Sequence, residues 1–298
     1  MSELIIVDSL NMIYKSCYAG KYTGKRSNLT TPSPGFTLQA PTGEITTGTF
    51  SFCQSLFKLC NTFKPTHLVA AGDVLATGLF RRRIYPNYKK SRRPHDNNIR
   101  RQVKRCLEII NKLAIPLVTA PTFEADDVIA SLVHKFESSF DSIRVVSSDK
   151  DLHQVVTDKT TIYDPLKDIV IDKKAVIETW GVEPCMIADV QALSGDYADG
   201  FEGVPSIGLT TAVRLIKEYK TAIGVYNNRH RIVPPSRSQT KIASALETSD
   251  IETFKAVVEL VKTVPITLTK EDLEFNGIQI SPELKDLFKQ LGFKRWAA

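Results

Sequence analysis

The chain has 298 residues, of which 42% are hydrophobic and 24% are charged, and its formal net charge is +6. These proportions exclude an intrinsically disordered chain, and the length is sufficient for one large domain or two modest ones. The cysteines form no Cys-x-x-Cys pair, which argues against a disulfide framework and against structural zinc. No stretch approaches the roughly 20 apolar residues of a membrane span and no signal-peptide pattern is present, so we expect a cytoplasmic protein without membrane contact.

The positive charge is concentrated in one segment. Residues 80–105 contain eleven Lys or Arg and one acidic residue, and the rest of the chain holds more acidic than basic residues. A basic segment on an otherwise acidic body is typical of proteins that bind a polyanion. The alternative interpretation is a basic helix face that is exposed to solvent.

Short apolar runs alternate with helical patterns in the first half of the chain, which predicts an α/β fold with a parallel sheet. Strands are predicted at residues 4–7, 67–71, 116–119, 143–147 and 161–163. Helices are predicted at residues 47–62, 100–113 and 125–136. Residues 19–43 are rich in Thr, Ser, Gly and Pro and predict an irregular loop.

The pattern changes near Gly181, where short helices replace the alternation of strands and helices. These helices are predicted at residues 184–193, 209–219, 237–245 and 251–261, with a polar connector at 227–235. We therefore predict a catalytic α/β domain at residues 1–180 and a helical domain at residues 181–298.

Acidic residues directly follow three of the predicted strands, namely Asp8, Asp73 and Asp149. Because ligands of open α/β sheets bind at the carboxyl ends of the strands, we expect these acids at one edge of the sheet. The alternative interpretation is structural, with Asp8 capping a helix and Asp73 belonging to a turn.

Three more acids fall in the first turn of the predicted helix at 125–136, for which we expect Thr122 to be the N-cap. Acids at this position complement the helix dipole, but three in four residues repel one another more than capping requires. Glu124 and Asp127 share a helix face, whereas Asp126 is turned away from them, so the three need not contact the same ion.

Two close pairs complete the acidic set: Asp149 with Asp151, and Asp196 with Asp199 in a glycine-flanked turn. If the fold brings all these acids together, they form a carboxylate cluster that repels itself unless a hard divalent cation binds there. The nine candidate metal ligands are Asp8, Asp73, Glu124, Asp126, Asp127, Asp149, Asp151, Asp196 and Asp199.

The segments LIIVDSLNMIYK, PTGEITTGTF, FEADDVIA, SSDKDLHQVV and SGDYADGFEGVPSIG occur in this order along the chain. With them the chain resembles the 5′-nuclease, or flap endonuclease, superfamily, which includes bacteriophage 5′-3′ exonucleases and the 5′-nuclease domain of bacterial DNA polymerase I. The resemblance implies a PIN-like α/β fold with a mostly parallel central sheet, a basic helical arch at about residues 80–113, and a C-terminal helical domain. It places a helix-three-turn-helix at about residues 192–222.

The resemblance also implies two Mg²⁺ ions, for which Mn²⁺ would substitute. Asp8, Asp73, Glu124, Asp126 and Asp127 would serve the first ion, and Asp149, Asp151, Asp196 and Asp199 the second. Two such ions can activate water and stabilise the leaving oxygen of a phosphodiester, so that no side-chain nucleophile is needed. The expected products carry a 5′-phosphate and a 3′-hydroxyl.

By the same resemblance, Lys89, Arg92 and Lys15 would act on the scissile phosphate. Tyr88 would stack a base, although a core tyrosine is the open alternative. The implied nucleic-acid contacts are Arg81, Tyr88 and Arg93 in the basic segment and Gly203, Ile207, Gly208, Thr210 and Arg214 in the helix-three-turn-helix, where K⁺ also binds in the family. The basic segment at 81–94 is expected to be mobile without a ligand.

The chain departs from the family pattern at three places. Ser206 replaces the commoner glycine, Thr210 and Thr211 stand where a lysine usually follows, and Gly200 replaces Asn or Asp. We expect altered affinity for the duplex rather than lost chemistry, because all nine carboxylates remain.

The predicted function is a structure-specific 5′-nuclease that removes 5′ flaps and RNA primers, including those of RNA–DNA hybrids, in replication or repair. We expect a monomer in the nucleoid or in the cytoplasm of a phage-infected host, with a DNA polymerase or a single-strand-binding protein as partner. Two alternatives stay open: a PIN-like single-strand ribonuclease and a non-catalytic protein that binds DNA junctions.

Overall fold

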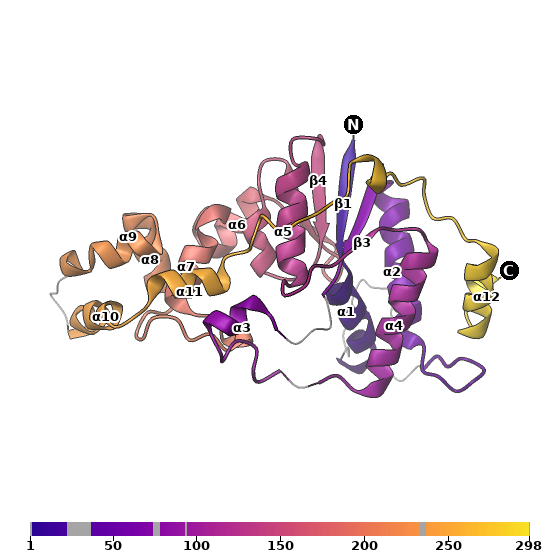
Figure 1. The fold of residues 1–298 in the computed structure, drawn as a ribbon, viewed down its shortest axis with the longest axis horizontal. Coiled ribbons are helices and arrows are strands. Elements are labelled where there is room, and N and C mark those ends of the chain that lie inside the picture. Colours follow the sequence, from indigo (N-terminus) through magenta and orange to yellow (C-terminus); the bar gives the residue numbers. More distant parts are fainter. Residues whose placement is uncertain (1, 23–36, 74–77, 93, 233–236, 298) are drawn as a thin grey trace.

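The computed structural model describes residues 2–22, 37–73, 78–92, 94–232 and 237–297 (Figure 1). A six-stranded sheet has the order β3-β2-β1-β4-β5-β6, and every neighbouring pair is parallel except β5 and β6. The strands are β1 (Glu3–Asp8), β2 (His67–Ala71), β3 (Leu117–Val118), β4 (Ser142–Val146), β5 (Thr160–Asp164) and β6 (Ile169–Ile171). The mostly parallel α/β fold and the five predicted strands are confirmed. The strand β6 has no counterpart in the prediction.

Both faces of the sheet are covered, which explains why the strands are continuous apolar runs. On one face, Ile5 and Val7 of β1 pack with the helices α1 (Ser9–Tyr22), α2 (Thr47–Phe63) and α4 (Asn97–Lys112). On the other face, Leu4 and Ile6 pack against α5 (Ala125–Phe136). Alternate residues of one strand therefore belong to two separate cores.

The strand order reverses between β1 and β4, because the chain first extends the sheet towards β2 and β3 and then returns to the other side of β1. Ligands of such sheets bind in the crevice beyond the carboxyl ends of the strands at this reversal. Asp8 ends β1, and Asp149 follows β4 within three residues. The sheet topology thus positions these two acids on either side of the crevice.

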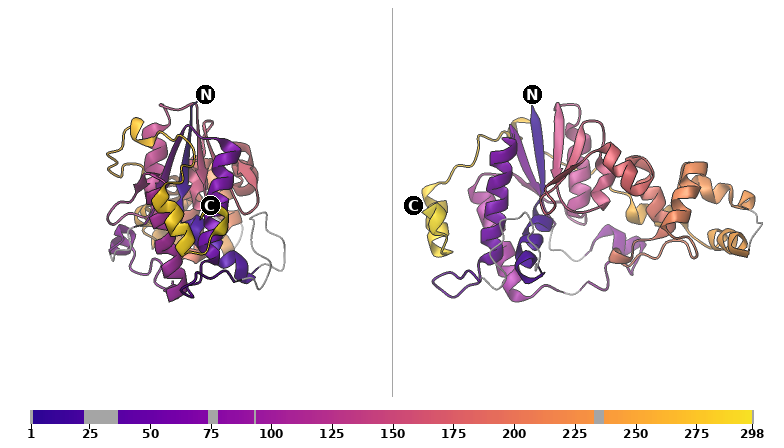
Figure 2. Two further views of the ribbon diagram at one scale, coloured as in Figure 1. Left: turned by 90° about the vertical axis from the view of Figure 1, so that its right-hand side faces the viewer. Right: turned by 180° about the vertical axis from the view of Figure 1, so that it is seen from behind.

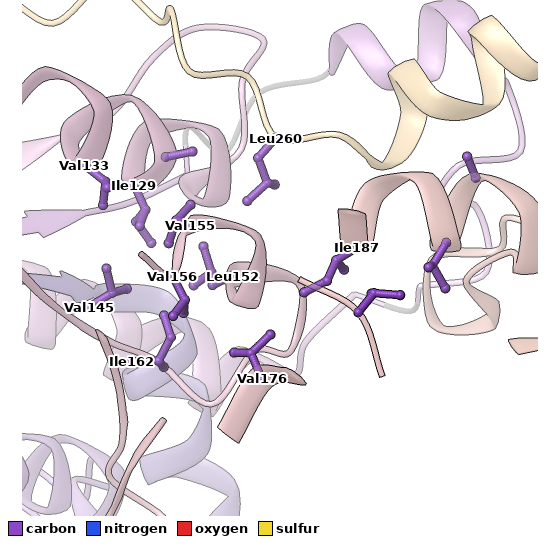
Figure 3. Packing of buried hydrophobic residues seen from close by; sticks show 14 of the residues in the cluster. Ile129, Val133, Val145, Leu152, Val155, Val156, Ile162, Val176, Ile187 and Leu260 are labelled. Atoms are coloured by element: carbon purple, nitrogen blue, oxygen red, sulfur yellow. The ribbon is translucent and has the colours of Figure 1, made fainter. Parts of the chain in front are cut away.

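The helical part of the chain extends from one side of the sheet (Figure 1). In the chain η1 (Asp151–Val155) follows β4, and α6 (Lys173–Trp180) follows β6. Beyond α6, the helical part contains η2 (Pro184–Met186), α7 (Ile187–Ser194), η3 (Tyr197–Asp199), α8 (Leu209–Tyr219), α9 (Ala222–Asn227), η4 (Arg229–Arg231), α10 (Arg237–Glu247) and α11 (Ile251–Val258). Its apolar core is continuous with that of the α/β part, since Ile129, Val145 and Ile187 belong to one cluster (Figure 3).

After α11 the chain returns to the α/β part (Figure 2). The Phe275 amide donates to the Thr66 carbonyl (2.9 Å) beside η5 (Glu271–Leu273) and β2. The last two helices, α12 (Pro282–Gln290) and α13 (Lys294–Ala297), pack on α2 through Phe288, Phe293 and Trp296. Residues 275–297 therefore contact the α/β part, and the division of the chain at Gly181 stays a prediction.

Most predicted helices agree with the structure, and those at 125–136 and 209–219 agree to the residue. The predicted loop at 19–43 is wrong at its start, because α1 continues to Tyr22, and residues 23–36 lie outside the described residues. Among the residues that are described, no helix has both the length and the apolar character needed to cross a membrane.

Candidate active site

Asp8 lies at the carboxyl edge of the sheet, as its position after a strand predicted. Its Oδ2 accepts a hydrogen bond from the Ser147 hydroxyl (2.8 Å), and its Oδ1 accepts from the Asn11 amide at the start of α1 (3.1 Å). Asp149 lies on the next strand end, where its Oδ1 accepts from the Asp151 amide (3.0 Å). Asp8 therefore caps a helix and borders the crevice at the same time.

The acids around the start of α5 belong to the same edge. Glu124 is the N-cap of α5 and forms a capping box with Asp127, whose Oδ2 accepts from the Glu124 amide (3.2 Å). Asp73 Oδ1 accepts from the Ala125 amide (2.5 Å). The expectation that Thr122 caps this helix is wrong, because Glu124 and Asp73 already accept from the free amides and Thr122 adopts a left-handed conformation (φ 69°) before the helix begins.

Gln191 of α7 joins the remaining acids, a role that the sequence did not indicate. Its side-chain amide donates to Asp151 Oδ1 (2.7 Å) and lies 3.4 Å from Asp196 Oδ2. Lys150 approaches the same Asp196 oxygen (3.3 Å). A small cavity is lined by Glu124, Asp126, Asp151, Asp196 and Asp199 together with Arg81, Tyr88 and Gln191.

The acids are close enough to perturb one another. Burial, with a contribution from the charges of Asp149 and Asp73, raises the pKa of Asp8 to about 7. Burial and the neighbouring Asp149 and Asp196 raise the pKa of Asp151 to about 7. The pKa of Asp126 is also well above its ordinary value, because of burial, Asp149 and Asp8. Acids from distant segments of the chain thus share one site, whose oxygen donors suit a hard divalent cation.

The basic segment reaches directly into this group of acids. Lys89 Nζ lies 2.5 Å from Glu124 Oε1 and 3.3 Å from Asp199 Oδ2, and Arg92 donates to Asp199 Oδ1 (2.6 Å). The Tyr88 hydroxyl lies 2.8 Å from Glu124 Oε2 and 3.0 Å from Asp199 Oδ2, so it donates to one of the two. Its ring is buried beside Phe201, which is the core position that the sequence left open.

Arg81 forms a different kind of contact, with Asp127. The guanidinium donates to Asp127 Oδ2 (2.6 Å) and Oδ1 (2.7 Å), and both side chains are inaccessible to solvent. The Val261 amide also donates to Asp127 Oδ1 (2.9 Å), and Arg81 donates to the Val257 carbonyl (2.7 Å). This ion pair joins α3 (Phe80–Ile84), α5 and the end of α11.

The chain matches the family described as "5'-3' exonuclease, N-terminal resolvase-like domain" over residues 3–181 and that described as "5'-3' exonuclease, C-terminal SAM fold" over residues 182–281. The chain belongs to the 5′-3′ exonuclease family. Its resemblance to the 5′-nuclease superfamily and its α/β fold with a C-terminal helical domain are thereby confirmed, and the helix-three-turn-helix stays a prediction.

The names of similar proteins are consistent with this family. The 5′-3′ exonuclease of Aquifex aeolicus is 32% identical over 294 residues, covering 99% of this chain and 93% of the relative. DNA polymerase I of Rhizobium leguminosarum is 30% identical over 288 residues, covering 94% of this chain but 26% of the polymerase. The chain thus spans most of the free-standing exonuclease and about a quarter of the polymerase.

Solved structures share the fold. The T5 5′-exonuclease with bound zinc has a TM-score of 0.69 at 19% identity and covers 87% of this chain and 90% of its own. The catalytic core of Rad2 in complex with DNA substrate has a TM-score of 0.59 at 13% identity and covers 98% of this chain and 88% of its own. At these identities the similarity establishes the fold alone.

In this exonuclease-family chain, the turn between α7 and α8 adopts backbone conformations that favour glycine. A Cβ on Gly203 (φ 69°) would lie 2.3 Å from the Gly195 nitrogen, so only glycine fits there. Ser206 has the same φ of 69°, in the left-handed region that glycine adopts more readily than serine. Gly200 (φ 70°) lies against the Asn87 carbonyl, where a Cβ would come within 3.2 Å.

The other residues predicted to contact nucleic acid differ in their exposure and in their position in the fold. Ile207 is buried in the core, whereas Gly208, the N-cap of α8, is exposed together with Thr210 and Arg214. Lys15 is exposed on α1, which begins directly after Asp8. Arg93 lies outside the described residues.

In the described part of this exonuclease-family chain, no three Asp, Glu, His or Cys side chains converge closely enough to hold a metal ion. The ammonium of Lys89 lies between Glu124 and Asp199, and the guanidinium of Arg92 bonds Asp199, so these two cations compensate part of the repulsion among the acids. A divalent cation would compensate the same charges, so the two kinds of cation compete for this site.

Proposed function

We propose that this chain is a divalent-metal-dependent, structure-specific 5′-nuclease that hydrolyses phosphodiester bonds at 5′ flaps and 5′ ends, including the RNA primers of RNA–DNA hybrids. One observation carries the proposal: acids from separate segments meet at the carboxyl edge of a parallel sheet beside a basic segment, and burial together with neighbouring carboxylates raises the pKa values of Asp8, Asp126 and Asp151. Raised carboxylate pKa values in a crevice are typical of functional sites. The polymerase relatives support a role in DNA replication.

The carboxylate oxygens of these acids suit two Mg²⁺ ions, or Mn²⁺ in their place, but the described acids would have to approach one another more closely to hold them. Eight of the nine acids are proposed as ligands, directly or through water: Asp8, Asp73, Glu124 and Asp126 for one ion and Asp149, Asp151, Asp196 and Asp199 for the other. When bound, the two ions would supply an activated water and stabilise charge on the leaving oxygen. Asp127 was expected among the ligands, but both of its oxygens bond Arg81, so we propose a structural role for it.

Lys89 and Arg92 bind and orient the scissile phosphate in this proposal. Both contact Asp199, and Lys89 also contacts Glu124, so a phosphate entering the site would exchange one anionic partner for another. Such preorganised cations stabilise the charge that develops on the phosphate. Lys15, exposed on the helix that follows Asp8, is the third residue proposed to contact this phosphate.

The duplex beside the cleavage site is proposed to bind at the turn between α7 and α8. Gly208 caps α8 without a side chain, so the first backbone amides of this helix are accessible to a DNA phosphate. Thr210 and Arg214 are exposed on the same helix and would add hydroxyl and cationic contacts, and K⁺ would bind the carbonyl oxygens of the turn. A monomer that works beside a DNA polymerase or a single-strand-binding protein completes the proposal.

A product map on a 5′-labelled flap duplex tests the function. We expect cleavage near the junction with Mg²⁺ and none with EDTA. Asp151→Asn should lower the rate by at least about 100-fold, because it removes charge from the site where the ions would bind. Asp158→Asn is the matched control, since Asp158 is an exposed surface residue.

Three other results of this test would contradict the proposed function or favour an alternative one. Normal cleavage by Asp151→Asn would refute the proposal. Faster cleavage of single-stranded RNA than of the flap would favour a PIN-like ribonuclease, and metal-independent binding without cleavage would favour a junction-binding protein.

A further inference from the structure

A second concavity lies beside the acidic site. This groove of about 560 Å³ is formed by η1, the end of α6, η3 and the start of α8. Its walls include Lys150, His153, Trp180, Asp196, Tyr197 and Leu209. Asp196 also lines the acidic cavity, so the groove adjoins the candidate site of cleavage. Its volume falls within the range of about 300–1,000 Å³ that is usual for small-molecule sites.

One wall of the groove is held rigidly by a pair of rings. The Trp180 indole N–H donates to His153 Nδ1 (2.9 Å), and the two rings meet edge to face at 81°. His153 is buried, whereas Trp180 is partly exposed. Because its only polar atom is bonded within the protein, the rest of the indole presents an apolar aromatic surface to the groove.

Two large side chains of the groove are unusually exposed: Tyr197 is 90% and Leu209 is 52% accessible to solvent. Tyr197 does not lie on a loose loop. The Ala198 amide donates to Asp196 Oδ1 (2.9 Å), and Asp196 exchanges backbone hydrogen bonds with Phe201 (2.7 and 2.9 Å). A rigid turn that presents a tyrosine to solvent beside a preformed groove is typical of a binding surface.

Exposed cations lie at the rim of the groove. Lys150 is more than half exposed and contacts the buried Asp196 (3.3 Å), and Lys217 is exposed on α8. Lys217 is near the groove, since its Nζ would lie 3.9 Å from a Cβ on Gly181, the residue after Trp180. Aromatic walls with a cationic rim complement a nucleotide, which has a flat base and an anionic phosphate. An apolar peptide would use the walls but not the cations.

We propose that this groove binds one unpaired nucleobase of the substrate, stacked on Tyr197 and bordered by Trp180 and Leu209, with its phosphate beside Lys150. The inference rests on the proposed function, because a nuclease substrate is what places a nucleic-acid strand beside Asp196. The groove would then select substrates that have an unpaired nucleotide next to the bond that is cut.

The two tryptophans of the chain make the groove observable. Trp180 lines it, and Trp296 lies on α13 in the aromatic cluster against α2. In Trp296→Phe, an unlabelled single-stranded oligonucleotide added in EDTA should quench the remaining fluorescence. In Trp180→Phe, the same oligonucleotide should bind without quenching Trp296. Binding itself is measured by the anisotropy of a labelled oligonucleotide.

Tyr197→Ala should weaken oligonucleotide binding by about 5- to 100-fold, the range for loss of one stacked base, whereas Tyr197→Phe should retain it. Tyr197 is exposed, so these variants should unfold like the wild type. An oligonucleotide with abasic positions should bind the wild type as weakly as the normal oligonucleotide binds Tyr197→Ala.

Unchanged affinity of Tyr197→Ala, or binding to Trp296→Phe without quenching, would overturn the inference. Flap cleavage by the wild type with Mg²⁺ is scored separately. If the wild type cleaves flaps and the groove variants bind normally, only the groove assignment fails. If the wild type binds through the groove but does not cleave flaps, the proposed function fails instead.

Discussion

Arg81 and Asp127 form a buried ion pair in which both carboxylate oxygens and the guanidinium are hydrogen-bonded within the protein. Removing one partner of such a pair leaves an uncompensated buried charge, which costs about 3–5 kcal/mol. The contact therefore bears on the stability of the whole chain, because it joins three helices that are far apart in sequence.

Arg81→Ala should lower the free energy of unfolding by about 3–5 kcal/mol, measured by urea denaturation. Arg83→Ala is the matched control, since Arg83 is exposed on the same short helix and a surface change of this kind usually stays within about 0.5 kcal/mol. Equal stability of the two variants would show that Arg81 is not a structural anchor.

The raised pKa values of Asp8 and Asp151 predict how stability depends on pH. Both pKa values are near 7 in the folded chain but 3.8 in the unfolded reference, so the folded chain binds more protons between these values. Without metal, the free energy of unfolding should therefore fall as pH rises from about 4 to about 7 and then level off.

Mg²⁺ should reverse this trend, because it needs ionised carboxylates and competes with the protons. We expect Mg²⁺ to raise the Tm more at pH 8 than at pH 5.5, measured against EDTA at each pH. A larger stabilisation at pH 5.5 would show that these acids are not the metal site.

The residues of the site were only partly predictable from the sequence. Strand-end acids such as Asp8 and Asp149 were found because sheet topology gathers strand ends at one edge. Gln191 was missed because a polar residue inside a helix gives no sign of its partner. Arg81 was expected to contact nucleic acid, since composition cannot tell which arginine of a basic segment is buried.

The helices α12 and α13 act as a cover on α2 rather than as part of the helical region. Phe293 and Phe288 are buried there, and Trp296 packs on Phe57 with ring centroids 5.1 Å apart. In Figure 1, α12 lies beyond α2 and α4, at the opposite end of the molecule from α8. We therefore expect this contact to contribute to stability.

Phe293→Ala should cost about 3–5 kcal/mol in unfolding free energy, as for other fully buried aromatic residues. The rate of flap cleavage at 25 °C should stay within about twofold of the wild type. Lys294→Ala, an exposed neighbour, is the control and should change neither quantity. A stable Phe293→Ala variant would mean that these last helices do not hold α2 in place.

Helices and strands were predicted correctly where the sequence has both a periodic apolar pattern and a clear residue signal at the end of the element. The helix α5 was found to the residue because its apolar face is bounded by acids at its start. The strand β6 was missed because it has three residues, and two of them, Ile169 and Val170, are exposed. The sequence did not predict that residues 260–281 return to the α/β part. This stretch has little regular structure, and its position depends on tertiary contacts.

The whole molecule has a continuous apolar core from the sheet to α8, although its outline divides into two parts. Such a core predicts one cooperative unfolding transition. Trp180 reports on the helical side and Trp296 on the cover over α2.

In the single-tryptophan variants Trp296→Phe and Trp180→Phe, the urea midpoint from fluorescence should coincide with that from circular dichroism. The reason is that the cluster containing Ile129, Val145 and Ile187 spans both parts, so unfolding of the helical part would disrupt the core of the sheet as well. Two separated midpoints in either variant would show that the parts unfold independently.

The chain crosses between the two parts twice, once after α6 and again after α11. Two connections and a shared apolar core restrict the motion of one part against the other more than a single linker would. If a duplex binds at the turn between α7 and α8, as proposed, these connections would hold the bound duplex close to the acids at the carboxyl edge of the sheet.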